Sequence, residues 1–299
     1  METKVDIAAM LEHWGLSEMT ATPIYGSANS TWEIGGRYVL KHNPNPGELA
    51  GSLQLTGLLA AEGIPVATHV RARDGGLTTP DGKNCLMRKL RGEVVDLYRR
   101  RELAAVLGGE LARLHAALAR IEPRVSGCCD NDLLAEWKSY IAPGIAGEIS
   151  GERIAYVEEG LLALYPALPR QLIHRDVHLN NLLFEGDRLS GWLDFDLKRR
   201  DARLFDIVYL LGSLQPEDRA RAPVWRSICG DILAGYERLQ PLSADERKAL
   251  PVLLLAEGLL FVAFWGDQGN QKKRREAAEA VDWLFQEDPM RHNTMGMTE

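Results

Sequence analysis

Residues 172–207, LIHRDVHLNNLLFEGDRLSGWLDFDLKRRDARLFDI, contain the clearest indications of fold and chemistry in this chain. Within it, an apolar strand ends at His174, and a polar loop carrying Asp176 and Asn181 follows. After a hairpin, a second apolar strand ends at Asp194. Strand ends that present carboxylates and a carboxamide toward a common point supply the oxygen ligands that a hard divalent cation prefers.

This arrangement is typical of phosphoryl transfer. The reaction needs a cation that neutralises charge on the phosphates, and a carboxylate that orients the acceptor hydroxyl and takes its proton. Asn181 follows Asp176 by five residues, so one loop can supply the base and one metal ligand. Asp194, on the neighbouring strand, then supplies a second ligand.

The segments before this stretch indicate a β-rich part that contains one long helix. Gly35-Gly36 separates two β-type runs, which is a signal for a two-residue hairpin. The helix is expected from Gly47 to Ala61, ending before Gly63. Two further strands are expected at Val66–Arg71 and Lys83–Lys89.

After Gly92 the pattern becomes helical, with leucines at three- and four-residue steps between Leu103 and Leu118. The sequence therefore predicts an α+β fold in two lobes: a small antiparallel-sheet N-lobe over residues 1–90 and a larger, mainly helical C-lobe over residues 91–290. Residues 291–299 are predicted to form a disordered tail.

The overall composition argues against several classes of protein. The net charge of −7 disfavours a nucleic-acid-binding surface, and the basic run Lys272–Arg275 is interpreted as a solvated helix face, with a nucleic-acid patch as the alternative. The N-terminus lacks the apolar region of a signal peptide, and the apolar stretch Leu250–Trp265 is interpreted as a buried helix too short to span a bilayer. The four cysteines lack metal-site spacing. These features predict a cytoplasmic protein with reduced thiols and no membrane partner.

The motifs of the 172–207 stretch resemble those of the protein-kinase-like superfamily. His174-Arg175-Asp176 with Asn181, followed by Asp194-Phe195, is similar to H-R-D-x-x-x-x-N and D-F-G. The spacing D-x-H-x-x-N, with His178 in the middle, resembles the aminoglycoside phosphotransferase and choline kinase branch. The stretches Leu111–His115 and Leu204–Ile207 are also similar to that branch, so the resemblance covers most of the chain.

The resemblance implies an ATP- and Mg²⁺-dependent kinase with a protein-kinase-like fold and a small-molecule hydroxyl as acceptor. Asp176 would be the catalytic base, Asn181 and Asp194 the metal ligands, and Lys41 the residue that holds the nucleotide phosphates. Two positions depart from the branch: Arg175 replaces a common glycine, and Asp196 replaces the glycine of D-F-G.

The resemblance also implies a wider set of binding and supporting residues. Glu48 is expected to pair with Lys41, Ser27 and Asn29 to cover the nucleotide phosphates from a hairpin at 25–32, and Met87 to lie at the adenine-binding hinge. His174, His178, Asp206 and His115 are expected to support the catalytic loop rather than to react.

Two alternatives stay open at this point. Arg175 is the protein-kinase form of the motif, although no A-P-E-like element follows and the stretch between Asp194 and Asp206 is short for an activation loop. A catalytically silent nucleotide-binding protein is the other alternative. The oligomeric state stays open. The acceptor is also not identified, and its candidate pocket residues are Glu136, Trp137, Glu257, Trp265 and Asp267.

Overall fold

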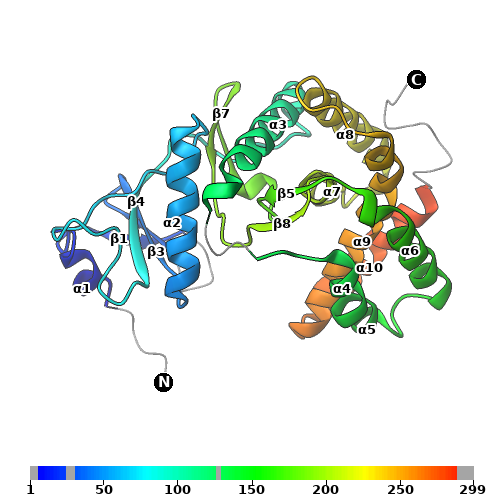
Figure 1. The fold of residues 1–299 in the computed structure, drawn as a ribbon, viewed down its shortest axis with the longest axis horizontal. Helices are drawn as coiled ribbons and strands as arrows, with labels where there is room; N and C mark the ends of the chain where they lie inside the picture. Colours follow the sequence, from blue (N-terminus) through cyan, green and yellow to red (C-terminus); the bar gives the residue numbers. More distant parts are fainter. Residues whose placement is uncertain (1–5, 25–30, 126–128, 288–299) are drawn as a thin grey trace. The chain divides into compact units, whose positions relative to one another are not determined.

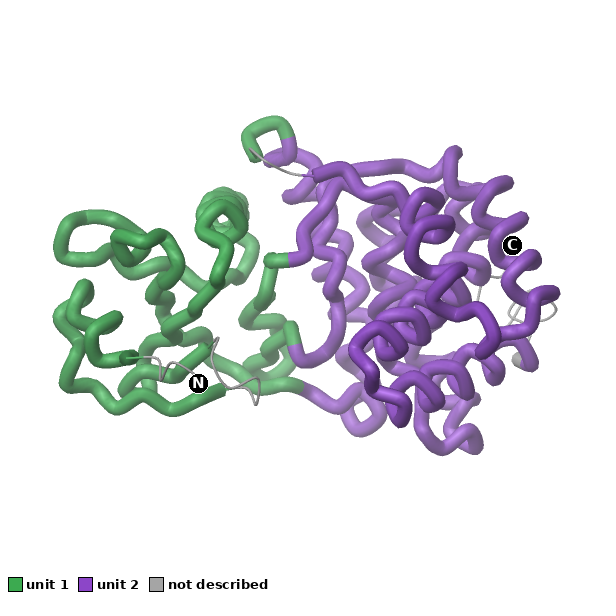
Figure 2. Tube along the Cα trace, turned by 90° about the horizontal axis from the view of Figure 1, so that it is seen from below, with its two compact units in different colours: residues 1–94, 123–127, 181–196 green, residues 95–122, 128–180, 197–299 purple. Residues whose placement is uncertain are grey.

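The computed structural model describes residues 6–24, 31–125 and 129–287 of the chain, and the expected tail at 291–299 lies outside them. The chain divides into two compact units (Figures 1 and 2). Unit 1 contains residues 1–94, 123–127 and 181–196, and unit 2 contains residues 95–122, 128–180 and 197–299. The β-hairpin of the 172–207 stretch therefore groups with the N-terminal sheet.

Unit 1 is built on a four-stranded antiparallel sheet in the order β1-β2-β3-β4. Its elements are α1 Ile7–Glu12, β1 Ala21–Pro23, β2 Thr31–Ile34, β3 Tyr38–His42, α2 Pro46–Ala61, β4 Asn84–Arg88, β6 Leu182–Glu185 and β7 Arg188–Trp192. The expected helix is present as α2, which begins after Asn45, whose side chain accepts hydrogen bonds from the first turn.

Apolar side chains pack on both faces of this sheet. One cluster contains Trp14, Trp32 and Leu40, and it closes under α1. On the other face, Leu49 and Leu53 of α2 pack against Cys85 of β4. The sheet is thereby held between α1 and α2, which fixes the position of β3.

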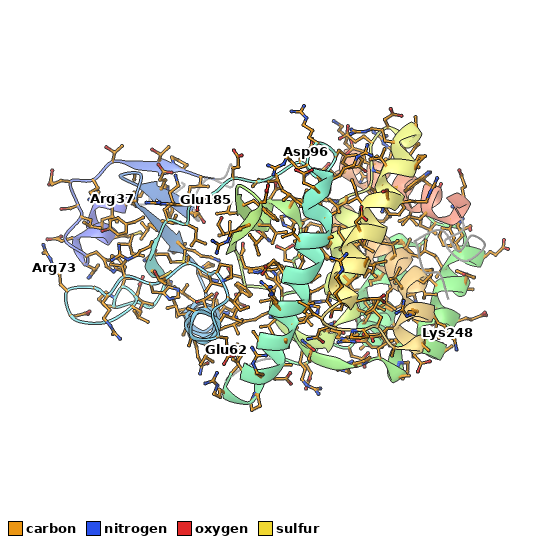
Figure 3. The ribbon with its side chains drawn as sticks, turned by 90° about the horizontal axis from the view of Figure 1, so that it is seen from above. Arg37, Glu62, Arg73, Asp96, Glu185 and Lys248 are labelled. Carbon is orange, nitrogen blue, oxygen red and sulfur yellow. The ribbon has the colours of Figure 1, made fainter. Side chains whose placement is uncertain are left out.

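Two turns in unit 1 show how far the local sequence determines the chain path. The loop between β2 and β3 has three residues, because Arg37 joins the two glycines, whose φ angles are +54° and +70°. The predicted two-residue turn is therefore wrong by one residue. The β6–β7 turn lies where it was predicted, with Glu185 paired to Arg188 across it. Figure 3 labels Arg37 and Glu185 beside these turns.

The segment Val66–Arg71 is not the regular strand that its sequence predicts. It runs beside β4 through backbone hydrogen bonds such as that from the Val70 N–H to the Leu86 carbonyl, at 2.8 Å. Only isolated bridges form there, one of them between Val66 and Trp192 of the β6–β7 hairpin. The segment thus divides its hydrogen bonds between two partners and joins the hairpin to the sheet.

Unit 2 is mainly helical, with one two-stranded antiparallel sheet of β5 and β8. Its elements are α3 Ala104–Ile121, α4 Leu133–Glu136, α5 Ala142–Ile145, α6 Gly151–Leu164, β5 Arg170–Ile173, β8 Arg199–Ala202, α7 Leu204–Ser213, α8 Ala222–Glu237, α9 Ala244–Asp267 and α10 Gln271–Glu287. The α+β prediction, with a sheet-based N-terminal part and a helical C-terminal part, is confirmed.

Helices α3 and α8 pack closely because two glycines face the partner backbone. A Cβ on Gly108 would lie 1.9 Å from the Ile232 carbonyl oxygen, and one on Gly235 would lie 2.1 Å from the Ala105 carbonyl oxygen. Any larger residue at either position would push the helices apart. This close contact anchors α3, which in turn packs against β5 at the start of the polar loop.

Helix α9 is the single helix in the described part of the chain that is long and apolar enough to cross a membrane by length and composition. The interpretation that this stretch is too short to span a bilayer is wrong, because the helix begins at Ala244 behind a capping box of Ser243 and Glu246. Its most apolar window is 67% buried, and α9 packs against α5, α6, α7 and α10. The interpretation as a buried helix is confirmed.

Candidate functional site

In unit 1, Lys41 lies between two carboxylates that follow β7. Its Nζ atom is 3.0 Å from Oδ1 of Asp194 and 2.6 Å from Oδ2 of Asp196. Burial alone would lower the pKa of Lys41, but the two carboxylates outweigh burial and raise it. The ammonium therefore stays charged at neutral pH.

Asp194 has an unusual backbone conformation, with φ at +56°. Aspartate enters this left-handed region more readily than most residues, and strained positions of this kind concentrate at functional sites. The N–H of Leu193 donates a hydrogen bond of 2.9 Å to the carbonyl of Asn181, so the structure brings the chain at Asn181 and Asp194 together. The Asp194 side chain is about half exposed, at 49%, so it is open to a ligand.

The oxygen atoms around Lys41 fit a hard divalent cation. Asp194 and Asp196 converge on one ammonium, and the second oxygen of Asp196, Oδ1, is buried without a hydrogen-bond partner among the described residues. The described residues hold no group of three or more His, Cys, Asp or Glu side chains arranged for a metal. Mg²⁺ is commonly held by one or two carboxylates, with phosphate oxygens and water completing its shell, so this donor set suits a nucleotide-bound ion.

The other expected nucleotide residues are placed differently. Glu48 is exposed on the first turn of α2, and Lys41 pairs with the two aspartates instead of with it. Met87 is half-buried in β4, opposite Val39 of β3. Ser27 and Asn29 lie outside the described residues.

In unit 2, Asp176 lies in the polar loop after β5 and contacts two aromatic side chains. The hydroxyl of Tyr209 donates a hydrogen bond of 2.6 Å to its Oδ1, and Nε2 of His178 lies 3.5 Å from the same oxygen. Burial alone would raise the pKa of Asp176, but hydrogen bonds from His178 and Tyr209 and electrostatic interactions with His178 and His174 lower it to about 2. Asp176 is therefore ionised at neutral pH.

The backbone of this loop is held by the buried carboxylate of Asp206. It accepts hydrogen bonds from the N–H groups of His174, at 2.9 Å, and Arg175, at 2.6 Å. It also lies 3.1 Å from Nε2 of buried His115, whose Nδ1 is 2.8 Å from the Tyr236 hydroxyl. This is the geometry expected of residues that support the loop, and their contribution to catalysis stays a prediction.

Arg175, for which the resemblance implies a glycine, has a backbone conformation that suits glycine and side-chain contacts that glycine cannot make. Its φ is +69°, a conformation that glycine adopts without strain and arginine does not. Its side chain makes an ion pair with Glu136 and stacks over Phe205, with the guanidinium carbon 5.0 Å from the ring centroid. These contacts, with the N–H bond to Asp206, offset the strain.

We expect Asp206→Ala to destabilise unit 2 strongly. The change removes the acceptor of the buried His174 N–H and of the half-buried Arg175 N–H, and it leaves buried His115 Nε2 without its partner. Each unsatisfied group typically costs about 1–3 kcal/mol. The free energy of unfolding, measured by urea denaturation, should fall by about 3 kcal/mol or more. Asp231→Ala, on the exposed face of α8, is the matched control and should change it by less than about 0.5 kcal/mol. Equal losses in the two variants would contradict the role assigned to Asp206.

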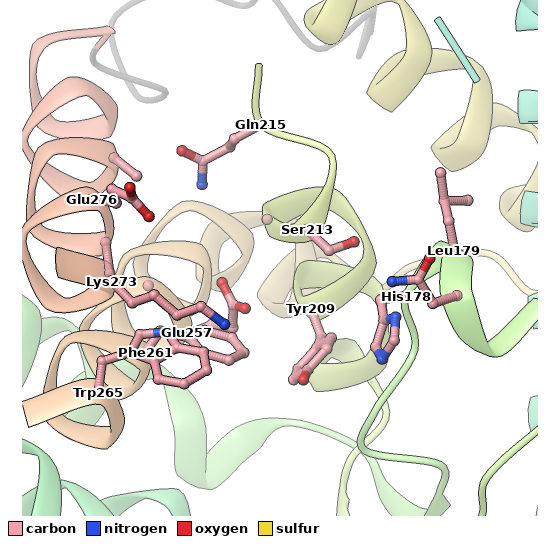
Figure 4. Close-up of a pocket in the computed structure, with 15 residues that line it drawn as sticks. His178, Leu179, Tyr209, Ser213, Gln215, Glu257, Phe261, Trp265, Lys273 and Glu276 are labelled. Atoms are coloured by element: carbon pink, nitrogen blue, oxygen red, sulfur yellow. The ribbon is translucent and has the colours of Figure 1, made fainter. Parts of the chain in front are cut away.

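A cavity of about 660 Å³ opens beside the loop, within unit 2 (Figure 4). His178 and Tyr209, which both contact the carboxylate of Asp176, line one side of it. The other side is formed by α9 and α10, which contribute Glu257, Trp265 and Lys273. Asp176 thus lies directly behind the wall of a cavity large enough for a small molecule.

Of the five residues proposed from the sequence for the acceptor pocket, two line the cavity and three do not. Glu257 and Trp265 line the cavity, whereas Glu136 pairs with Arg175, Trp137 is fully buried and Asp267 is exposed. Tyr209 is a cavity residue that the motifs of the sequence do not indicate. Its position three residues after Asp206 was the available signal, because residues three apart lie on one helical face.

A sequence model described as "Phosphotransferase enzyme family" matches residues 20–242. The chain belongs to this family. A homoserine kinase of Acidiphilium cryptum is 30% identical over 282 residues, which cover 86% of this chain and 83% of that protein.

Solved structures share the fold of this phosphotransferase at low sequence identity. A wild-type aminoglycoside 2'-phosphotransferase-IIIa, solved with GDP, superposes with a TM-score of 0.72 at 14% identity, covering 96% of this chain and 99% of that one. A microcompartment-associated aminopropanol kinase has a TM-score of 0.71 at 20% identity, covering 93% and 94%. The fold is thus protein-kinase-like, and the phosphotransferase is a kinase that acts on a hydroxyl of a small molecule.

Proposed function

We propose that this kinase uses ATP and Mg²⁺ to phosphorylate the hydroxyl of a small amino alcohol bound in the cavity beside Asp176. The observation that carries the proposal is the position of Asp176, held ionised by two residues that themselves line that cavity. The relative and the fold neighbour named above act on homoserine and aminopropanol, both of which carry an amino group and a hydroxyl.

The proposed reaction has a simple balance. The bond between the γ-phosphorus of ATP and its bridging oxygen breaks, a bond from that phosphorus to the acceptor oxygen forms, and ADP leaves. Asp176 orients the acceptor hydroxyl and takes its proton. Its low pKa makes it a weak base, so its main work is positioning, and the proton moves as the new bond forms.

The residues around Lys41 serve the nucleotide in this proposal. Lys41 binds the α- and β-phosphates, while Asn181 and Asp194 hold Mg²⁺, which neutralises charge on the phosphates when it is bound. The orphaned oxygen of Asp196 supports a role for that residue beside them. Met87 is assigned to the adenine hinge, and Glu48, Ser27 and Asn29 stay predictions.

The proposal is tested by ADP formation with a panel of acceptors: homoserine, aminopropanols, aminoglycosides, choline and sugars. We expect acceptor-dependent ADP formation that stops in excess EDTA and returns when Mg²⁺ is added. Phosphorus NMR should show one phosphomonoester per ADP. No acceptor-dependent ADP from the whole panel, or activity that persists in EDTA, would overturn the proposal.

A further inference from the structure

The cavity contains a buried carboxyl group for which the described residues provide no hydrogen-bond or ion-pair partner. Glu257 is 3% exposed and lines the cavity from α9, and it makes no hydrogen bond or ion pair among the described residues. Gly212 leaves room for this carboxyl group. A Cβ atom at that position would lie 2.4 Å from Oε2 of Glu257. Buried acids without a partner are rare, because burial without compensation is unfavourable.

A second unsatisfied acceptor belongs to the lining of the same cavity. The side-chain oxygen of Gln215 is buried without a hydrogen-bond partner in the described part of the chain, and Gln215 also lines the cavity. Glu257 and Gln215 thus present two free acceptors, which are the groups that an ammonium with three donors requires.

The cavity also contains an unpaired cation. Lys273 extends from α10 with Nζ 4.1 Å from the centroid of the Trp265 ring, and it makes no ion pair among the described residues. The remaining charged groups of the lining have partners: Glu276 pairs with Lys272, at 3.7 Å, and His178 contacts Asp176. Figure 4 shows Glu257 and Lys273 on the side of the cavity opposite His178 and Tyr209.

We propose that Glu257 and Lys273 form a two-charge site that binds the ammonium and the carboxylate of a zwitterionic amino alcohol. The inference rests on the proposed function, because the acceptor hydroxyl must reach Asp176 behind the wall that His178 and Tyr209 form on the other side. The two-charge site favours one of two kinds of amino alcohol, those with a carboxylate, such as homoserine, over those without one, such as aminopropanol. An amino alcohol without a carboxylate leaves Lys273 unused, whereas a hydroxy amino acid satisfies both charges.

Three matched acceptors separate the two charges. Homoserine carries both, 3-amino-1-propanol lacks the carboxylate, and 4-hydroxybutanoate lacks the ammonium. A charge-assisted hydrogen bond corresponds to about a 10–100-fold change in affinity. The wild-type enzyme should therefore prefer homoserine to either analogue by at least ~10-fold in kcat/KM.

Two variants assign each charge to a residue. Lys273→Gln should raise KM ~10-fold or more for homoserine and leave 3-amino-1-propanol unchanged, while Glu257→Gln should raise KM for both. In each case kcat should change little, because the lost contact is made equally before and during the reaction. Arg275→Gln, which removes an exposed positive charge from the same helix, is the control and should change neither KM.

Folding does not confound these variants. Burial raises the pKa of Glu257 well above its ordinary range, so an uncharged amide of the same shape resembles the carboxyl group of the free protein. The negative charge of Glu257 is favoured only when the ammonium of the acceptor binds beside it, and glutamine cannot supply that charge. A carboxyl group with a raised folded pKa opposes folding at pH values above its ordinary pKa. Glu257→Gln should therefore have an equal or higher Tm than the wild type at pH 7.

The possible failures are distinguishable. No acceptor-dependent ADP formation from any acceptor would overturn the proposed function itself. If a kinase activity is found, the two-charge site is tested by the acceptors. It is overturned if an acceptor that lacks the ammonium or the carboxylate is used as well as the zwitterionic acceptor. It is also overturned if Lys273→Gln raises KM equally for homoserine and 3-amino-1-propanol, because a merely structural role would affect both.

Discussion

Asp176→Asn should lower kcat by about 10²–10⁴-fold, the usual contribution of a positioned general base. The amide keeps the shape of the side chain, so the Tyr209 hydroxyl can still donate a hydrogen bond to its oxygen. It cannot take the acceptor proton, however. Steady-state kinetics with the acceptor identified by the panel measures the loss, and ATP titration should give a nucleotide Kd close to that of the wild type.

The pH dependence of the wild type adds a second check on Asp176. Its pKa is lowered to about 2, so the ionised form is present above that value and is lost only as the pH falls through it. Asp176 should therefore produce no acid limb in kcat/KM between about pH 5 and 8. Tyr209→Phe removes one stabilising hydrogen bond, and the resulting rise in pKa should still leave this range flat.

One result would exclude Asp176 as the general base. If Asp176→Asn keeps kcat within about tenfold of the wild type while folding normally, general-base catalysis by this residue is excluded. A loss of nucleotide affinity equal to the loss of kcat would instead indicate a role in binding.

Local sequence predicted the parts of this molecule that depend on short-range rules. The turn at 185–187 follows from its residues, and the structure places it there. The placement of Asp176 and Asn181 on one loop between two strands could be predicted, because the spacing of two residues along a loop is fixed by the chain itself. The three-residue loop after β2 was missed because two glycines allow either turn, and the register of β2 against β3 decides between them.

The residues of the cavity could not be predicted in this way. Tyr209, Glu257 and Lys273 come from α7, α9 and α10, and their meeting depends on how these helices pack. The partner of Lys41 was sought on the next helix, at Glu48, but lies 153 residues away at Asp194. Contacts between residues so far apart in the sequence produce no periodic pattern, so they can be seen only in the folded structure.

Asp194→Asn should lower kcat/KM for the nucleotide by at least ~100-fold, because a metal ion contributes several kcal/mol to stabilising the charge of the transition state. Asparagine suits this position, since it adopts the left-handed conformation at φ +56° as readily as aspartate. The backbone should therefore keep its path while the charge on the ligand is lost. The Mg²⁺ concentration that gives half-maximal activity should rise by at least ~10-fold.

Two further variants show whether the effect belongs to the metal. Glu185→Gln removes an exposed carboxylate from the β6–β7 turn of the same unit and should leave the Mg²⁺ dependence unchanged. Asp196→Asn weakens the contact of Asp196 with Lys41, so its main effect should be on the Kd for ATP. If Asp194→Asn and Glu185→Gln have the same Mg²⁺ dependence, Asp194 is not a metal ligand. The role of the Asp194 carboxylate would then be to pair with Lys41, whose charge needs a partner when no phosphate is bound.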